Sequence, residues 1–327
     1  MDFRTRVALP EPLFHLSPAD ETLFAGSCFA ENVGRFLADS RFRCSVNPFG
    51  VLYNPVSIAA LLCLSVSEEK PAEPDFFEAG GRWCSWLNDS SFDADSLADC
   101  KAGLEKVLED VRTGWRKRKA LFLTLGTNRL YVHRETGRAV GNCHKQPARL
   151  FEERVLTVEE TVRVLGEALT AVWQVAPQLK VVFTVSPYRY AKYGFHESQL
   201  GKSVLLLAAD ALCREYPERC MYFPAYELLL DELRDYRFYA DDMLHPSGRA
   251  VQYIRECFSQ VFFTEEARMF QKDWEAVTRA LEHRPLHPGS EEHRNFVRHT
   301  MEKLELLQKK YPGIVVSDEM RRLSAML

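Results

Sequence analysis

Long apolar runs are absent from this 327-residue sequence, although 46% of its residues are hydrophobic. Apolar stretches such as residues 181–185 and 204–209 end well short of the roughly 18 residues that span a bilayer. The N-terminal segment carries charges at Asp2, Arg4 and Arg6 and lacks the apolar core of an export signal. We therefore expect a soluble protein that has no membrane partner and no export signal.

An excess of one sign of charge is also lacking. Lysine and arginine number 42 against 46 aspartates and glutamates, which leaves a formal net charge of −4. Domains that bind nucleic acid through their overall charge are strongly basic, so we predict no nucleic-acid partner. The 27% charged and 12% aromatic residues, together with the apolar fraction, also exclude a disordered or collagen-like chain.

Paired cysteines are missing as well. The nine cysteines are odd in number, scattered, and never spaced as Cys-x-x-Cys. This pattern argues against a disulfide framework and against a zinc knuckle. We therefore predict a reducing, cytoplasmic location and no metal site.

Short apolar segments alternate with amphipathic helical ones, which predicts an α/β fold with a mainly parallel sheet covered by helices. Two of the apolar segments are continuous runs typical of central strands that are buried on both faces. The predicted strands are residues 22–24, 43–46, 120–125, 180–185 and 221–223. The predicted helices are residues 28–38, 55–66, 96–112, 158–175, 199–214 and 247–263.

The character of the chain changes after Thr264. Two charge-dense amphipathic segments predict a C-terminal helical appendage over residues 264–327, separate from a main domain over residues 1–263. Such helices either pack on the sheet domain or contact a second copy of the chain. The sequence therefore leaves open a homo-oligomer formed through them.

Ser27 directly follows the first predicted strand and precedes the first predicted helix. This position lies at the carboxyl end of the sheet, where open α/β folds bind their ligands. We expect a serine hydroxyl there to be exposed and so available as a nucleophile, and backbone N–H groups at a helix start can stabilise an oxyanion. The alternative interpretation is that Ser27 only caps the helix.

Asp242 precedes His245 by three residues, on a loop that ends before the last predicted helix of the main domain. A carboxylate at this spacing can bond one imidazole nitrogen and fix the tautomer, which leaves the other nitrogen to deprotonate a serine. The spacing predicts that Asp242, and not the adjacent Asp241, is the partner of His245.

These motifs resemble the SGNH/GDSL hydrolases, and more closely the GSCFA-domain family, whose name is spelled by Gly-Ser-Cys-Phe-Ala at 26–30. The resemblance continues through Asn-Pro-Phe-Gly at 47–50, Asn-Cys-His-Lys at 142–145 and Phe-Thr-Val-Ser-Pro at 183–187, and covers roughly residues 20–263. It implies a flavodoxin-like, three-layer α/β/α fold. It also implies that Ser27 is the catalytic nucleophile, with His245 as base and Asp242 as the acid that orients it.

The same resemblance implies an oxyanion hole with three donors. Two are the backbone N–H groups of Ser27 and Gly50, and the third is an asparagine side chain. We favour Asn128 because it follows the third predicted strand, although Arg129 stands where the superfamily has an aspartate. Asn142 is a rival on the same connection.

Three further side chains are candidates for substrate binding. His144 and Lys145 can bind an anionic or sugar group, or can hold a long loop in place. Arg189 follows the fourth strand and can line the cleft, although arginine stems also cover apolar surface. Cys28 with His144 is a weaker alternative nucleophile pair, because we expect Cys28 to point into the packing between helix and sheet.

The leading functional hypothesis is a serine esterase or acyltransferase that acts on an ester, with resemblance favouring a small acyl group on a carbohydrate. The acyl-enzyme passes its acyl group to water or to an alcohol, and no metal or organic cofactor is required. The alternative is a non-catalytic binding or interaction protein that keeps the fold and works through its histidine-rich C-terminal helices.

Overall fold

The computed structural model describes residues 4–283, 286–311 and 313–327. Its central sheet has five parallel strands in the order β10-β9-β5-β1-β2. In chain order this is 2-1-3-4-5, the flavodoxin-like doubly wound arrangement. The strands are β1 (Glu21–Gly26), β2 (Cys44–Val46), β5 (Arg118–Leu125), β9 (Lys180–Val185) and β10 (Cys220–Tyr222). The predicted α/β fold class is therefore confirmed.

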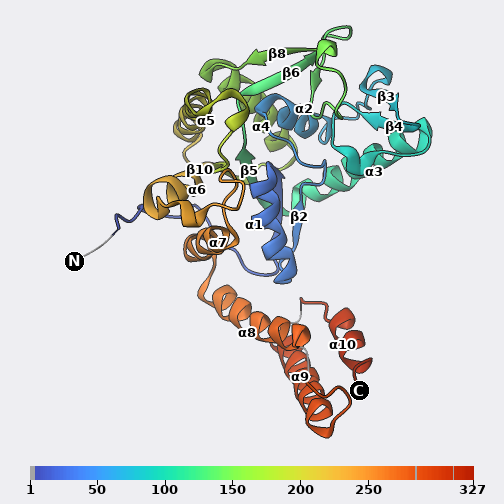
Figure 1. Cartoon of the computed structure of the whole chain (residues 1–327), viewed down its shortest axis with the longest axis vertical. Coiled ribbons are helices and arrows are strands. Elements are labelled where there is room, and N and C mark those ends of the chain that lie inside the picture. The colour runs from blue at the N-terminus through green and yellow to red at the C-terminus, as the bar shows by residue number, and fades with distance from the viewer. Residues whose placement is uncertain (1–3, 284–285, 312) are drawn as a thin grey trace.

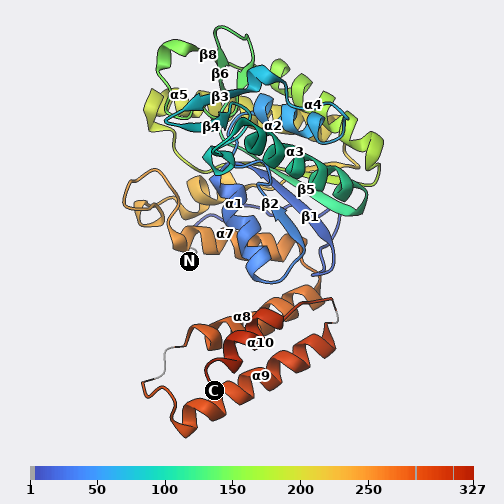
Figure 2. The ribbon, with the colours of Figure 1, turned by 90° about the vertical axis from the view of Figure 1, so that its right-hand side faces the viewer.

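The sheet lies between two helical layers, as Figure 2 shows edge-on. Alternate side chains of each strand point to opposite faces, so Leu23 and Leu121 join one apolar core while Phe24 and Phe122 join the other. One face is covered by α2 (Pro55–Leu64), α3 (Leu97–Gly114), α4 (Val158–Val175) and α5 (Phe195–Glu215). The other face is covered by α1 (Cys28–Asp39) and α7 (Gly248–Phe262).

Side-chain caps set where most of these helices begin. The oxygen of Ser27 accepts a hydrogen bond from the first turn of α1, and Asn54, Ser96, Thr157 and Ser247 do the same for α2, α3, α4 and α7. Each such cap contributes about 0.5–2 kcal/mol to stability. The helix starts predicted from the sequence agree with the structure to within one residue, except at α5, which begins four residues earlier than expected.

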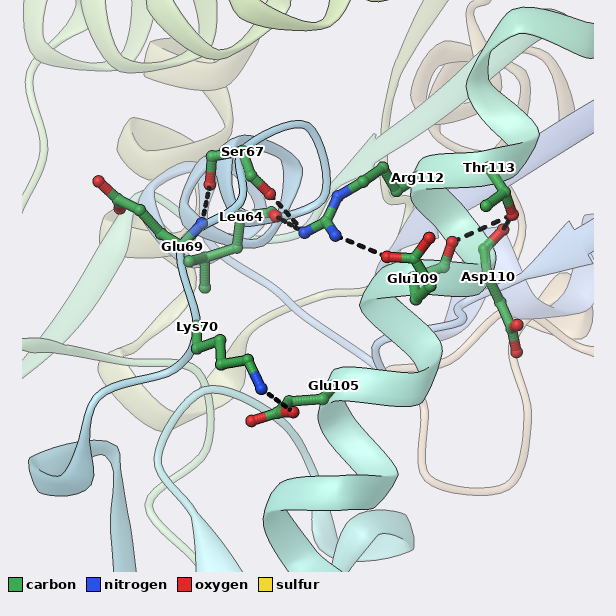
Figure 3. Close-up of polar contacts among 9 residues, drawn as sticks. All are labelled: Leu64, Ser67, Glu69, Lys70, Glu105, Glu109, Asp110, Arg112 and Thr113. Carbon is green, nitrogen blue, oxygen red and sulfur yellow. Dashed lines mark hydrogen bonds and ion pairs between the residues drawn. The ribbon is translucent and has the colours of Figure 1, made fainter.

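Polar contacts fasten the end of α2 to α3 (Figure 3). The guanidinium of Arg112 donates to the backbone carbonyls of Leu64 and Ser67, and it also pairs with Glu109 at 2.6 Å. Farther along the same connection, the Lys70 ammonium lies 2.8 Å from a carboxylate oxygen of Glu105. Arg112 thereby satisfies the carbonyl of the last residue of α2, which the helix itself leaves unpaired, and that of Ser67 just beyond it.

Smaller elements surround the main sheet, and the sequence did not predict them. They are the hairpin β3 (Phe76–Ala79) and β4 (Arg82–Ser85), the antiparallel sheet β7-β6-β8 formed by β6 (Arg129–His133), β7 (Ala139–Val140) and β8 (Phe151–Val155), the short α6 (Ala225–Glu227) and the π-helical turn η6 (Leu228–Leu233). Single 3₁₀ turns lie at η1 (Glu73–Asp75), η2 (Ser90–Phe92), η3 (Trp115–Lys117), η4 (Ala148–Leu150), η5 (Ala191–Tyr193) and η7 (Tyr236–Phe238).

The C-terminal region consists of α8 (Glu265–Glu282), α9 (Glu291–Lys310) and α10 (Ser317–Ser324), which lie together beyond one edge of the sheet layers (Figure 1). Their apolar side chains belong to the same buried cluster as α1 and α7. Phe42 packs against Phe270 with ring centroids 5.9 Å apart, and the Trp274 indole donates to the carbonyl of Asp39 at 2.8 Å. Within the described residues, none of the helices combines the length and apolar character that crossing a bilayer requires.

Candidate active site

Ser27 lies where β1 turns into α1. The preceding Gly26 has φ = +130°, and a Cβ atom there would lie 2.2 Å from the carbonyl oxygen of Thr124, so only glycine fits. Ser27 is only 2% exposed, so the expectation of an exposed hydroxyl is wrong, and its Oγ accepts a hydrogen bond from the Phe29 amide at 3.3 Å. The side chain is therefore a helix cap. It also lies where the segments that follow the neighbouring strands β1 and β5 lead to helices on opposite faces of the sheet, the usual ligand position of this topology.

A cavity of about 280 Å³ opens at this point. Residues from the start of α1 line one side, namely Ser27, Cys28, Phe29 and Asn32. Residues that follow the other strands and the last loop line the rest, namely Tyr53, Gly126, Ser186, Tyr188, Tyr190, His245 and Pro246. Ser27 and His245, which are 218 positions apart in the sequence, therefore face one cavity.

The Asp242–His245 pair has the geometry that its spacing predicts. Asp242 Oδ2 lies 2.5 Å from His245 Nδ1, and Asp242 Oδ1 accepts the backbone N–H groups of Leu244 and His245, each at 2.9 Å. These contacts, with the backbone donation from His245 as the largest cause, lower the pKa of the Asp242 carboxyl to about 2. The carboxylate is thus ionised at neutral pH and holds the proton on Nδ1, which leaves Nε2 as an acceptor. Asp241 is exposed, and no hydrogen bond or ion pair joins it to another described residue.

Arg189 holds the loop that carries this pair. Its backbone N–H donates to the carbonyl of Leu244 at 3.1 Å, and its guanidinium donates to the carbonyl of Met243 at 3.1 Å. The guanidinium also lies over the ring of Phe195, 4.2 Å from the centroid. Arg189 is not among the residues that line the cavity, so its contacts are those of a loop brace.

The other expected binding residues also lie outside the cavity lining. The His144 side chain is 4% exposed, and its Nε2 donates to two backbone carbonyls, whereas Lys145 is exposed. From the sequence we expected Cys28 to point into the packing between helix and sheet, and this expectation is wrong. It lines the cavity, with its Sγ 3.4 Å from the hydroxyl oxygen of Tyr53.

The expected oxyanion donors are engaged elsewhere. The Gly50 N–H donates to the carbonyl of Asn47 at 2.8 Å, and the Ser27 N–H donates to that of Thr124 at 3.1 Å. The Asn128 side chain donates to the carbonyl of Leu156 at 3.0 Å, and none of Gly50, Asn128 and Asn142 lines the cavity. Their assignment to an oxyanion hole stays a prediction.

Sequence reasoning missed two polar groups at the cavity. Asn32 lies four residues after Cys28 on α1, and residues at this spacing share a helix face, which is the signal that points to it. Lys202 of α5 is buried behind the cavity, where its Nζ donates to the carbonyls of Gly126 at 2.6 Å and Ser186 at 2.7 Å. Burial lowers the pKa of the Lys202 ammonium to about 7.

The fold and the cavity define a doubly wound α/β protein with a serine, a histidine and an aspartate gathered at the switch point of its sheet. The chain belongs to the GSCFA family: the family's sequence model matches residues 21–258. A second model, described as the C-terminal domain of GSCFA domain proteins, matches residues 274–327.

One solved structure similar to this chain is an acetyl xylan esterase, Est2A, from the rumen bacterium Butyrivibrio proteoclasticus. It is 11% identical, the match covers 74% of this chain and 63% of the esterase chain, and the TM-score is 0.38. No curated protein matches the chain.

Proposed function

We propose that the chain is a serine hydrolase or acyltransferase that acts on esters through an acyl-enzyme. The observation that carries the proposal is that Ser27 and His245 line one cavity while His245 Nδ1 is bonded to the ionised Asp242. A serine hydroxyl is a weak nucleophile until an adjacent base takes its proton. An imidazole whose Nδ1 carries a proton held by a carboxylate can take that proton at Nε2.

The reaction then runs in two halves. The Ser27 Oγ–H proton moves to His245 Nε2 as Oγ forms a bond to the ester carbonyl carbon, and the carbonyl oxygen becomes an oxyanion. When the intermediate collapses, the bond to the leaving alcohol breaks and His245 returns the proton to the alcohol oxygen. Water or a second alcohol repeats the sequence on the acyl-enzyme and restores Ser27.

The oxyanion needs donors within the cavity. Cys28 is the first residue of α1, where backbone N–H groups have no intrahelical acceptor and the helix dipole favours negative charge. The Asn32 side chain, from the same helix face, is a second donor in reach of the cavity. It competes with the expected Asn128 and Asn142 for the role of the asparagine donor.

The size of the cavity favours a short acyl group. Its volume of about 280 Å³ lies at the lower end of the range for small-molecule sites. Burial raises the pKa of the Tyr53 and Tyr190 hydroxyls, so both remain protonated and can donate hydrogen bonds to a polar alcohol portion such as a sugar. We propose the ester of a small acid with a polyhydroxylated alcohol as the substrate class.

Fluorophosphonate labelling tests the proposal, because this probe phosphonylates a serine only when a base activates it. We expect the wild-type chain and Cys28→Ala to be labelled and Ser27→Ala to be unlabelled, with hydrolysis of short aryl esters following the same order. Ester hydrolysis that persists in Ser27→Ala and is lost in Cys28→Ala would assign the nucleophile to Cys28. A wild-type chain that neither reacts nor hydrolyses esters would favour the alternative of a binding protein in which Ser27 is only a cap.

We also propose that residues 264–327 are a helical extension of a main domain that spans residues 1–263. The contacts of α9 with α8 and with α10, and the separate family model that matches residues 274–327, support this division. The exposed apolar side chains of Leu306 and Val315, 63% and 69% exposed, leave surface for a second copy of the chain. Sedimentation of the full chain at several concentrations tests the homo-oligomer.

A further inference from the structure

Three side chains with metal-binding atoms meet outside the cavity, from separate segments of the chain. Cys84 is on β4, Asp93 ends the 3₁₀ turn η2, and His144 is on the loop that follows β7. The thiol sulfur, one carboxylate oxygen and one imidazole nitrogen all lie within 4.8 Å of one another. Cys84 is 3% exposed and the His144 side chain 4%, so the cluster is enclosed by protein.

The hydrogen bonds of His144 decide which ring nitrogen faces the cluster. Nε2 lies 2.8 Å from the carbonyl oxygen of Ser85 and 3.0 Å from that of Asn88. A carbonyl can only accept, so Nε2 carries the proton and Nδ1 of the neutral ring is an acceptor. A backbone carbonyl that holds the far nitrogen in this way is the usual support for a metal-binding histidine.

Nδ1 faces another acceptor. It lies 3.7 Å from Asp93 Oδ1, a distance too long for a hydrogen bond. Among the described residues, no group meets hydrogen-bond geometry to this buried carboxylate oxygen, and its neighbour in the cluster, the Cys84 thiol, is only a weak donor. A cation bound between the oxygen and Nδ1 would satisfy both atoms better than the thiol does.

The distance between His144 Nδ1 and Asp93 Oδ1 fits two ligands of one metal ion. Zinc holds nitrogen and oxygen ligands at about 2.0–2.2 Å, and at a tetrahedral angle two such ligands lie about 3.4 Å apart. The observed 3.7 Å is close to this value. A set of one sulfur, one nitrogen and one oxygen suits zinc, whereas calcium and magnesium prefer oxygen alone.

We propose that Cys84, Asp93 and His144 form a zinc site, with water as the fourth ligand on the side of Asp93, whose side chain is 19% exposed. On binding, the Cys84 thiol releases its proton to solvent and its sulfur coordinates the ion. None of the three residues lines the cavity that contains Ser27, so the ion acts as a clip. It joins the β3–β4 hairpin to a loop 60 residues farther along the chain, and so stabilises the fold.

The test uses the full-length, untagged chain, stripped with a chelator and then given Zn²⁺ alone. We expect about one tightly bound zinc per chain by elemental analysis and a rise in Tm on zinc addition. Co²⁺ in place of Zn²⁺ is expected to give the thiolate charge-transfer absorption that only a cysteine ligand produces. Cys84→Ser, Asp93→Asn and His144→Gln are expected to lose most of the stoichiometric zinc.

Matched controls are Cys220→Ser and His133→Gln, which change a buried cysteine and a buried histidine outside the cluster and are expected to bind zinc as the wild type does. Far-ultraviolet circular dichroism checks folding, and if Cys84→Ser does not fold, the more exposed Asp93→Asn carries the test. Ser27→Ala is expected to keep its zinc, which separates this proposal from the proposed hydrolase. Substoichiometric zinc in the wild type, or full retention in folded cluster variants, would overturn the site and leave these three residues as a buried polar cluster without a metal.

Discussion

Asp242→Asn is the change that most directly tests the proposed catalytic arrangement. The asparagine oxygen can still accept the backbone N–H groups of Leu244 and His245, so the loop should keep its shape. The asparagine NH₂ group then faces His245 Nδ1 at the position of Oδ2. Because two donors cannot bond each other, the imidazole proton moves to Nε2, the nitrogen that must accept the proton of Ser27.

The size of the loss follows from how exposed the pair is. For a buried serine-protease triad the same change lowers kcat by about 10⁴-fold. Here the His245 and Asp242 side chains are 49% and 44% exposed, so water can replace part of the lost interaction. We therefore expect kcat/KM to fall by roughly 10–100-fold, toward the lower end of that scale.

Steady-state hydrolysis of a short aryl ester from pH 4 to pH 9 measures the effect. Because the pKa of Asp242 is lowered to about 2, the carboxylate stays ionised throughout this range, and any acid limb in the wild type must come from another group. Asp241→Asn is the matched control and should stay within a few fold of the wild type. A folded Asp242→Asn with unchanged kcat/KM, or a large loss in Asp241→Asn alone, would refute the assigned pairing.

Three further outcomes are expected. Asn32→Ala should lower kcat by about 10²–10³-fold with little change in KM if Asn32 is the oxyanion donor, and a loss confined to Asn128→Ala would return that role to Asn128. Arg189→Ala should lower kcat by freeing the loop at Met243 while KM holds, whereas a rise in KM alone would mean that Arg189 binds substrate. The pKa of Lys202 falls from 10.5 to about 7 on folding, so between these pH values the unfolded chain binds more protons than the folded one. The free energy of unfolding of the wild type should therefore rise relative to that of Lys202→Met as the pH increases from 7 to 10. Urea unfolding that shows no such trend would contradict the lowered pKa.

The central strands were predictable because their signal is local. The segments around β5 and β9 are continuous apolar runs, and all five predicted strands appear in the sheet with ends shifted by at most two residues. The surrounding strands carry no such signal. In β8, four of the five side chains are exposed, so the sequence lacks the alternation that predicts a half-buried strand.

In the candidate site, too, the short-range features were predictable from the sequence and the long-range ones were not. Ser27 after β1 and the three-residue spacing of Asp242 and His245 are short-range patterns, and the structure places Ser27 and His245 at one cavity. Tyr188 and Tyr190 line the cavity, as their place after the fourth predicted strand suggested, but Tyr53 reaches it from the segment after β2, and no short-range spacing pairs it with them.

What the sequence by itself determined are features set within a few residues: the strand and helix segments, the cap at Ser27, and the turn that joins Asp242 to His245. Only the tertiary structure decided where longer-range partners lie. Asn128 turns to the carbonyl of Leu156, and His144 turns inward to meet Cys84, 60 positions away. The physical reason is that capping and turn formation depend on neighbouring backbone groups, whereas the direction of a side chain on a long connection depends on which distant segment supplies its hydrogen-bond partner.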